Sequence, residues 1–249
     1  MSRGSPALVL LPALILLPVG GYCGAPFQTD DPAVLAFGHV ELLAFYQGTL
    51  SATGRGGTLP GLESHFGIHE KTELDLVTPL AFETPSGSGT AHGYGDTLLG
   101  LKYRLVDESA TSPLVSLVPK VTIPTGNSSR GLGNGGSQVF LAAAAQWHSD
   151  RFQTYANAGY WINNGTGNRD YWFVGWQAQY AFSATWLLGA EVFHTTSQFQ
   201  GQPPSTGFNL GGYCVFDPHN QLLFSAGRGL QNAAATNRAS TYLGYQLSF

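Results

Sequence analysis

Twelve segments of alternating residue character, joined by connections of alternating length, constrain this chain more than any other feature. From Gly38 onward, apolar residues alternate with small or polar ones over 38–50, 59–68, 71–83, 95–107, 112–126, 137–148, 151–163, 170–182, 185–197, 207–217, 221–229 and 238–249. The connections are long at 51–57, 84–94, 126–136, 164–169, 198–205 and 230–237, and short at 69–70, 108–111, 149–150, 183–184 and 218–220. A soluble sandwich has no reason to sort its connections in this way, whereas a membrane β-barrel has long loops at one end and short turns at the other. The pattern therefore predicts an all-β, transmembrane, antiparallel up-and-down β-barrel of about twelve strands, with both termini at the end that carries the short turns.

The last segment shows the alternation most clearly. Its two faces carry Leu243, Tyr245, Leu247 and Phe249 on one side and Tyr242, Gly244, Gln246 and Ser248 on the other. An apolar face opposite a small or polar face suits a strand between lipid and a wet lumen. The segment also resembles the C-terminal strand of bacterial outer-membrane barrels, which typically ends in phenylalanine. That resemblance implies that the barrel-assembly machinery recognises the chain at Phe249.

The composition fits a barrel in contact with membrane lipids. Charged residues make up 10% of the 249 residues, against about 25% in a typical soluble domain, so the chain lacks the charge that a soluble surface needs. Aromatic residues lie near the predicted strand ends, where a girdle at the lipid–water interfaces is expected: Trp147, Tyr160, Trp172 and Trp186. The formal net charge of −4 gives no basic surface for nucleic acid, so nucleic acid is not expected as a partner.

The N-terminus has the layout of a secretory signal peptide. Arg3 supplies a positive charge, residues 7–19 form an apolar run, and small residues follow. The run is shorter than the roughly 20 apolar residues that span a bilayer. We expect cleavage after Cys23 or close by, which leaves Cys214 as the single thiol and excludes a disulfide framework. The predicted organisation is a signal peptide over 1–23, an N-terminal periplasmic or plug segment over 24–37, and the barrel over 38–249.

Four stretches of the chain also resemble a known family. They are Gly93-Tyr-Gly-Asp-Thr-Leu-Leu-Gly-Leu-Lys-Tyr-Arg-Leu105 preceded by His92, Val118-Pro-Lys-Val-Thr-Ile-Pro-Thr-Gly126, Tyr155-Ala-Asn-Ala-Gly-Tyr160 and Leu188-Gly-Ala-Glu-Val192. Their succession resembles the meta-pathway phenol-degradation family of transporter-like outer-membrane proteins, over about Phe27 to Phe249. The resemblance implies a barrel and the passage of small aromatic or other hydrophobic compounds, and it carries over no catalytic residues.

Strand parity places most charged side chains of the predicted barrel on its inward face. The inward set comprises Glu41, Glu63, His65, Glu73, Asp75, Asp96, Lys102, Arg104, Lys120 and Glu191, whereas Arg228 points outward near the rim of the long loops. A Lys or Arg facing hydrocarbon costs about 2–4 kcal/mol near the midplane, so this sorting is informative. We expect a lumen-lining set that controls selectivity as a charged constriction: Glu63, His65, Glu73, Asp75, Lys102, Arg104, Lys120 and Glu191. The alternative is a salt-bridged network that fills the lumen, because twelve strands lie between small, filled barrels and the open channels of about 16–18 strands.

Catalysis is a weaker hypothesis. Some membrane barrels hydrolyse lipids with a serine and a histidine, and here His194 lies near Ser197 while His148 precedes Ser149. Such neighbours are common by chance, and no strong acidic partner falls on the same face. The seven histidines show no metal-ligand spacing, and no nucleotide-binding fingerprint occurs. We therefore expect no enzyme, no metal and no cofactor.

The expected function is passive diffusion of small, hydrophobic or aromatic solutes across the bacterial outer membrane. The expected partners are outer-membrane lipids, the assembly machinery and the solute itself. A closed structural barrel and a lipid-modifying enzyme are the competing hypotheses.

Overall fold

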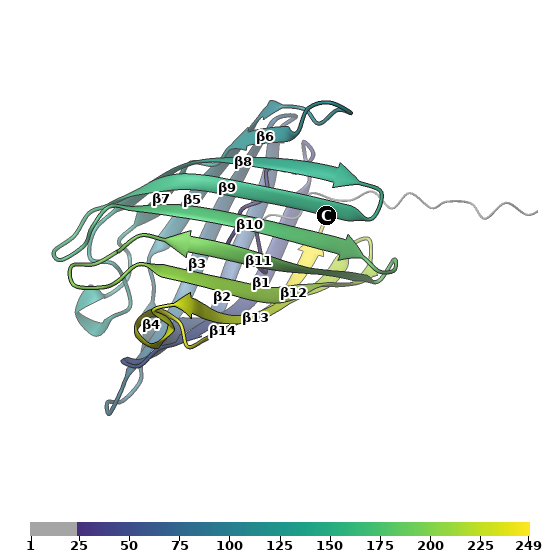
Figure 1. Ribbon diagram of the computed structural model, residues 1–249. Coiled ribbons are helices and arrows are strands. Elements are labelled where there is room, and N and C mark those ends of the chain that lie inside the picture. Colours follow the sequence, from purple (N-terminus) through teal and green to yellow (C-terminus); the bar gives the residue numbers. More distant parts are fainter. Residues whose placement is uncertain (1–23) are drawn as a thin grey trace, which may run out of the picture.

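Pairing between the first and last strands closes the sheet into a barrel in the computed structural model, which describes residues 24–249 (Figure 1). Strand β1 (Val40–Leu50) runs antiparallel to β14 (Ala239–Ser248), from Glu41 opposite Ser248 to Leu50 opposite Ala239. The other strands are β2 (Gly54–His69), β3 (Thr72–Pro85), β4 (Ala91–Tyr94), β5 (Thr97–Val106), β6 (Leu114–Leu117), β7 (Lys120–Ile123), β8 (Gln138–Ser149), β9 (Phe152–Asn163), β10 (Tyr171–Ala181), β11 (Trp186–Thr195), β12 (Ser205–Asp217) and β13 (Asn220–Gln231). Two short helical turns, Ser128–Arg130 and α1 (Ala233–Thr236), lie in the long loops. The predicted signal peptide, 1–23, lies outside the described residues.

The predicted number of twelve strands is confirmed. Each strand pairs antiparallel with its neighbours, β4 continues the path of β5 beside β3, and β6 and β7 together occupy one position between β5 and β8. Pro119 separates β6 from β7, since proline has no N–H to donate to the ladder. Figure 1 shows the C-terminus at the end of the barrel that carries the short turns after β8 and β10.

The predicted long loop at 51–57 is wrong. Strand β2 begins at Gly54, five residues earlier than expected, and leaves a connection of residues 51–53. Gly57 pairs with Gly48 of β1 and with Phe82 of β3, and a Cβ on Gly57 would overlap the Gln47 carbonyl. The glycines that suggested a loop therefore allow close approach of neighbouring backbones within a strand. Residues 91–94, also expected in a loop, form β4.

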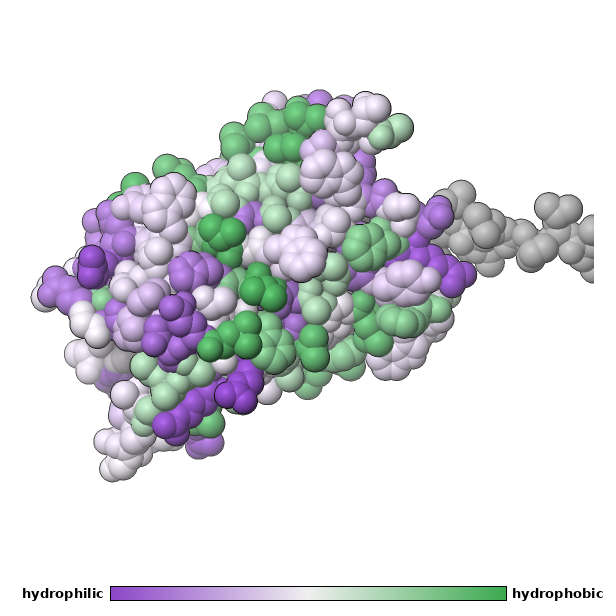
Figure 2. Space-filling model, viewed as in Figure 1, coloured by the Kyte–Doolittle hydropathy of each residue, from purple (hydrophilic) through white to green (hydrophobic). Residues whose placement is uncertain are grey.

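The outer face of the barrel exposes many large apolar side chains. Exposed large side chains include Trp147, Trp172, Trp176, Trp186, Leu210 and Leu243. Figure 2 shows hydrophobic residues over the middle of the wall and hydrophilic ones gathered towards the two ends. Tyr160 lies against Trp172 with ring centroids 5.0 Å apart, at a strand end, as an interfacial aromatic girdle requires. Within residues 24–249, no helix is both long enough and apolar enough to cross a membrane.

We expect Leu243→Arg to destabilise the barrel in a depth-dependent way. Leu243 is 51% exposed in the middle of β14, so an arginine there faces hydrocarbon and costs about 2–4 kcal/mol. Ala239→Arg, on the same face at the loop end of β14, should cost about 0–1 kcal/mol. Urea unfolding of the barrel in phospholipid vesicles measures both, and equal losses for the two variants would contradict the assignment of this face to lipid.

The inner face carries a charged cluster on one side and a cluster of large apolar side chains, set among buried amides, on another. Strands β1 to β5 contribute buried Glu41, His65, Glu73, Asp75 and Lys102. On the other side, a buried cluster comprises Val118, Phe140, Ala142, Ala144, Phe173 and Phe193. The expectation of a small or polar inner face is therefore wrong at Phe140 of β8, Phe173 of β10 and Phe193 of β11.

Candidate functional site in the barrel interior

Residues 24–37, here called the crossing segment, pass through the barrel interior (Figure 1, purple). Near its start, the Tyr213 hydroxyl of β12 donates a hydrogen bond of 2.6 Å to the Ala25 carbonyl. Further along, the Ser116 hydroxyl of β6 donates to the Pro32 carbonyl, and the Leu35 N–H donates to the Glu73 carboxylate of β3. The segment is thus held from strands on opposite sides of the wall. It has no strand or helix of its own, and its backbone groups pair with wall side chains and with its own Asp31, which accepts from the Gly24 and Ala33 N–H groups.

Glu191 of β11 is the most heavily bonded anchor of the crossing segment. Its carboxylate accepts hydrogen bonds from the Gln28 N–H at 2.9 and 3.0 Å, the Thr29 N–H at 2.9 Å and the Thr29 hydroxyl at 2.7 Å. The Asn209 amide of β12 donates another at 2.6 Å. Glu191 is 1% exposed, and hydrogen bonds to an ionised group are roughly twice as strong as neutral ones.

Two lysines bind the acidic part of the crossing segment. The Lys120 ammonium of β7 lies 2.6 Å from Asp30, whose second oxygen accepts from the Asn157 amide at 3.1 Å. The Lys102 ammonium of β5 donates to the Ala33 carbonyl at 2.7 Å. It also lies 3.5 Å from Asp31.

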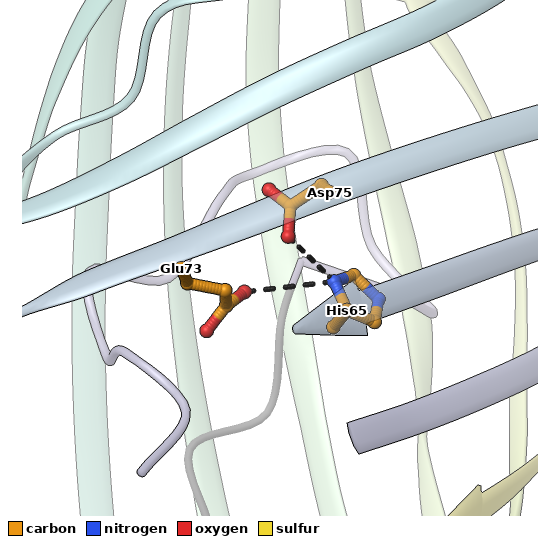
Figure 3. A group of neighbouring side chains, drawn as sticks. All are labelled: His65, Glu73 and Asp75. Atoms are coloured by element: carbon orange, nitrogen blue, oxygen red, sulfur yellow. Dashed lines mark hydrogen bonds and ion pairs between the residues drawn. The ribbon is translucent and has the colours of Figure 1, made fainter. Parts of the chain in front are cut away.

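The charged cluster of the wall is organised around His65 (Figure 3). One imidazole nitrogen, Nδ1, lies 2.8 Å from Asp75 and 3.5 Å from Glu73, and both dashed lines in Figure 3 end on it. The other, Nε2, lies 3.6 Å from Glu63. Strands β2 and β3 bring these side chains together because His65 pairs directly with Asp75.

His65, Glu73 and Asp75 could offer a cation three ligand atoms within 4.8 Å of one another. The Lys102 ammonium, however, lies 3.5 Å from the Glu73 oxygen that faces His65. These carboxylates therefore have cationic and hydrogen-bonding partners within the chain. The arrangement is that of a buried charge network.

Arg104 stands apart from the other residues selected from the sequence. Its guanidinium donates to the Glu70 carbonyl at 2.8 Å and lies 2.9 Å from Asp107, at the end of the barrel where β2 turns into β3. The structure brings Glu63, His65, Glu73, Asp75 and Lys102 together on one side of the interior. Lys120 and Glu191 lie elsewhere in the interior, where they bind Asp30 and Thr29 of the crossing segment.

Among residues 24–249, cavities lie on two sides of the Asp30–Lys120 ion pair. The first, of about 240 Å³, is lined on the charged side by residues that include Glu63, His65, Lys102 and Tyr242. The second, of about 200 Å³, is lined by aromatic side chains: Phe140, Trp161, Tyr171 and Phe173. Gln28, Asp30 and Lys120 border both cavities, so the Asp30–Lys120 ion pair lies between them.

Sequence reasoning missed these four aromatic residues and the acidic pair Asp30 and Asp31. The parity that turns Trp172 outward also turns Tyr171 and Phe173 inward, so a signal for the aromatic cavity was present. No such signal identified the partners of Asp30 and Asp31, because the crossing segment has no alternation of apolar and polar residues from which to infer the direction of its side chains.

Comparisons with known proteins give one family and a set of similar barrels. The family model described as "Putative MetA-pathway of phenol degradation" matches residues 52–249. A crystal structure of an outer membrane channel from Pseudomonas putida F1 is similar with a TM-score of 0.71 at 18% identity, covering 88% of this chain and 98% of that one. The KdgM porin in complex with disordered oligogalacturonate has a TM-score of 0.58 at 9% identity, covering 85% and 99%. No curated protein sequence matches the chain. The shared fold and the apolar outer face place this barrel in the bacterial outer membrane.

Proposed function

The chain belongs to the MetA-pathway phenol-degradation family, and from this premise we propose that it is a channel for passive diffusion of small, uncharged, hydrophobic or aromatic solutes. The observation that carries the proposal is a cluster of large apolar side chains on one side of the barrel interior. A barrel that conducts hydrophilic solutes has a polar interior, whereas here buried Phe140, Phe173 and Phe193 line one side of it. An apolar solute can replace water against such a wall at no desolvation cost.

The crossing segment sets the size limit in this proposal. Its fourteen positions lie between the charged cluster and the apolar cluster of the wall, beside cavities of about 240 and 200 Å³. Pockets for drug-sized molecules measure about 300–1,000 Å³, so each cavity suits a smaller molecule. Solutes of one ring are the class that fits.

The charge network would act against anions. Asp31, Glu63, Glu73 and Asp75 outnumber the neighbouring Lys102 and His65, and rings of carboxylates disfavour anions in membrane pores. In this proposal Glu63, His65, Glu73, Asp75 and Lys102 set charge selectivity, while Lys120 and Glu191 hold the crossing segment. Arg104 belongs to the periplasmic turn and contributes little.

The proposal includes no enzymatic activity. The imidazole of His194 lies 2.8 Å from the Thr206 hydroxyl, its cross-strand partner, and this contact gives the side chain a structural role at the membrane rim. Solved structures with a similar fold include an outer membrane channel and a porin. A lipid-modifying enzyme is therefore less well supported than a channel.

We expect the protein to raise the uptake of radiolabelled phenol into lipopolysaccharide-containing vesicles several-fold, with little ionic current in a planar bilayer. Thr195→Phe should abolish most of the increase, because Thr195 lines the aromatic cavity. His194→Phe is the matched control, one residue along β11 on the opposite face. An unheated gel shows that each variant is folded. Uptake no faster than in protein-free vesicles would overturn the proposal and favour a closed structural barrel.

A further inference from the structure

The aromatic cavity is built from rings on three neighbouring strands. Phe140 of β8 and Trp161 of β9 are stacked with ring centroids 4.6 Å apart, and Trp161 is stacked with Tyr171 of β10 at 5.9 Å. Phe173 meets Phe140 edge to face at 6.4 Å and 82°. These rings form a continuous wall whose geometry is that of favourable aromatic pairs.

The strand register and one glycine allow these rings to pack together. Trp161 pairs directly with Tyr171 across the β9–β10 ladder, which sets their rings side by side. Gly159 lies beneath Phe140, and a Cβ at Gly159 would overlap the Phe140 ring. The chain therefore places a glycine where the phenylalanine ring must lie close to β9.

Polar groups close the opposite side of the cavity. Gln28 and Asp30 of the crossing segment reach it, as do Lys120, Thr195 and Gln198 of the wall. The Lys120 ammonium lies 6.0 Å from the centre of the Phe140 ring and 2.6 Å from Asp30. Amide, hydroxyl and carboxylate groups supply donors and acceptors within reach of a ring that lies on the aromatic wall.

The cavity volume and charge define the ligand. A cavity of about 150 Å³ with an apolar lining accommodates benzene, so the 200 Å³ found here has room for one ring with a small substituent. Because Asp30 and Lys120 already neutralise each other, an anionic substituent would have to displace Asp30 from Lys120. A neutral hydroxyl can instead hydrogen-bond to the amide or carboxylate groups without breaking that pair.

We propose that the aromatic cavity is a binding site for one neutral monocyclic phenol, whose ring packs against Phe140, Trp161 and Phe173 and whose hydroxyl meets the Gln28–Asp30 side. The site rests on the proposed function, because a solute must enter the barrel to reach it. The proposed function requires only diffusion through the barrel, whereas this proposal adds a specific binding site on the path.

The test is a ¹⁹F NMR titration of the mature, detergent-folded protein with 4-fluorophenol. We expect saturable binding that phenol displaces and cyclohexanol does not, since cyclohexanol has the hydroxyl without an aromatic ring. Trp161→Leu should weaken binding about tenfold, the effect of losing one aromatic pair. Trp172→Leu is the matched control, because Trp172 is 54% exposed on the lipid face of the adjoining strand.

A second variant tests the site even if Trp161→Leu does not fold. Thr195→Phe fills the cavity from β11 and should also remove saturable binding. Equal affinity in Trp161→Leu, Thr195→Phe and wild type would overturn the site. Vesicle uptake without saturable binding would overturn the site and leave the proposed function intact, whereas binding without uptake would overturn the proposed function and leave the site.

Discussion

Glu191→Ala should raise the single-channel conductance of the barrel several-fold, because it releases the crossing segment from the wall. The substitution leaves the N–H groups of Gln28 and Thr29 and the Asn209 amide without their acceptor. Each buried donor left unpaired costs about 1–3 kcal/mol, so the loss is about 3 kcal/mol or more. A difference of that size raises the population of released segments on the order of 100-fold. Planar-bilayer recordings on the refolded mature protein measure the change.

Two further variants bracket this result. Deletion of residues 25–37 removes the segment itself and should give the largest conductance of the series. Val192→Ala alters the neighbouring residue on the lipid face and should conduct like wild type. If the deletion variant folds and conducts no more than wild type, the crossing segment does not limit the path.

The sequence predicted the wall well because lipid imposes a strict requirement on it. A strand with hydrocarbon on one side must alternate, and all twelve strand positions were found from that alternation. The prediction was wrong at residues 54–58, where glycines carry no side chain and therefore give no face to read. There the neighbouring strands decide that β2 continues, since Gly56 and Gly57 have pairing partners on both sides.

The interior was less predictable because its contacts are long-range. Parity correctly turned Lys120 and Glu191 away from lipid. It could not show that their partners are Asp30 and Thr29, which lie 90 and 162 positions away in the sequence. Parity also says nothing about depth along the barrel axis. Arg104 and Lys102 share a face, yet Arg104 contacts a turn and Lys102 lies in the central network.

Lys102→Met should lower the free energy of unfolding by about 3–5 kcal/mol, the usual cost of removing one partner from a buried ion pair. The Lys102 side chain is 3% exposed, and its loss leaves Asp31 and Glu73 without their shared cation. Arg104→Met is the control, because its partner Asp107 is 60% exposed and such surface pairs contribute about 0–1 kcal/mol. Urea unfolding in vesicles, followed by tryptophan fluorescence, compares the two variants.

The same measurement separates the two hypotheses for the inward charges. If they line a water-filled constriction, solvent screens Asp31 and Glu73 after the loss of Lys102, and Lys102→Met costs little more than Arg104→Met. If they form a dry network that also holds the crossing segment, the cost is several kcal/mol larger. The double variant Lys102→Met with Glu73→Gln should then recover part of the loss, because it removes one of the two carboxylates that lose their shared cation. Conductance measured on the same variants gives a further distinction. Lys102 also donates to the Ala33 carbonyl of the crossing segment. A dry network therefore predicts that Lys102→Met lowers the stability and raises the conductance together.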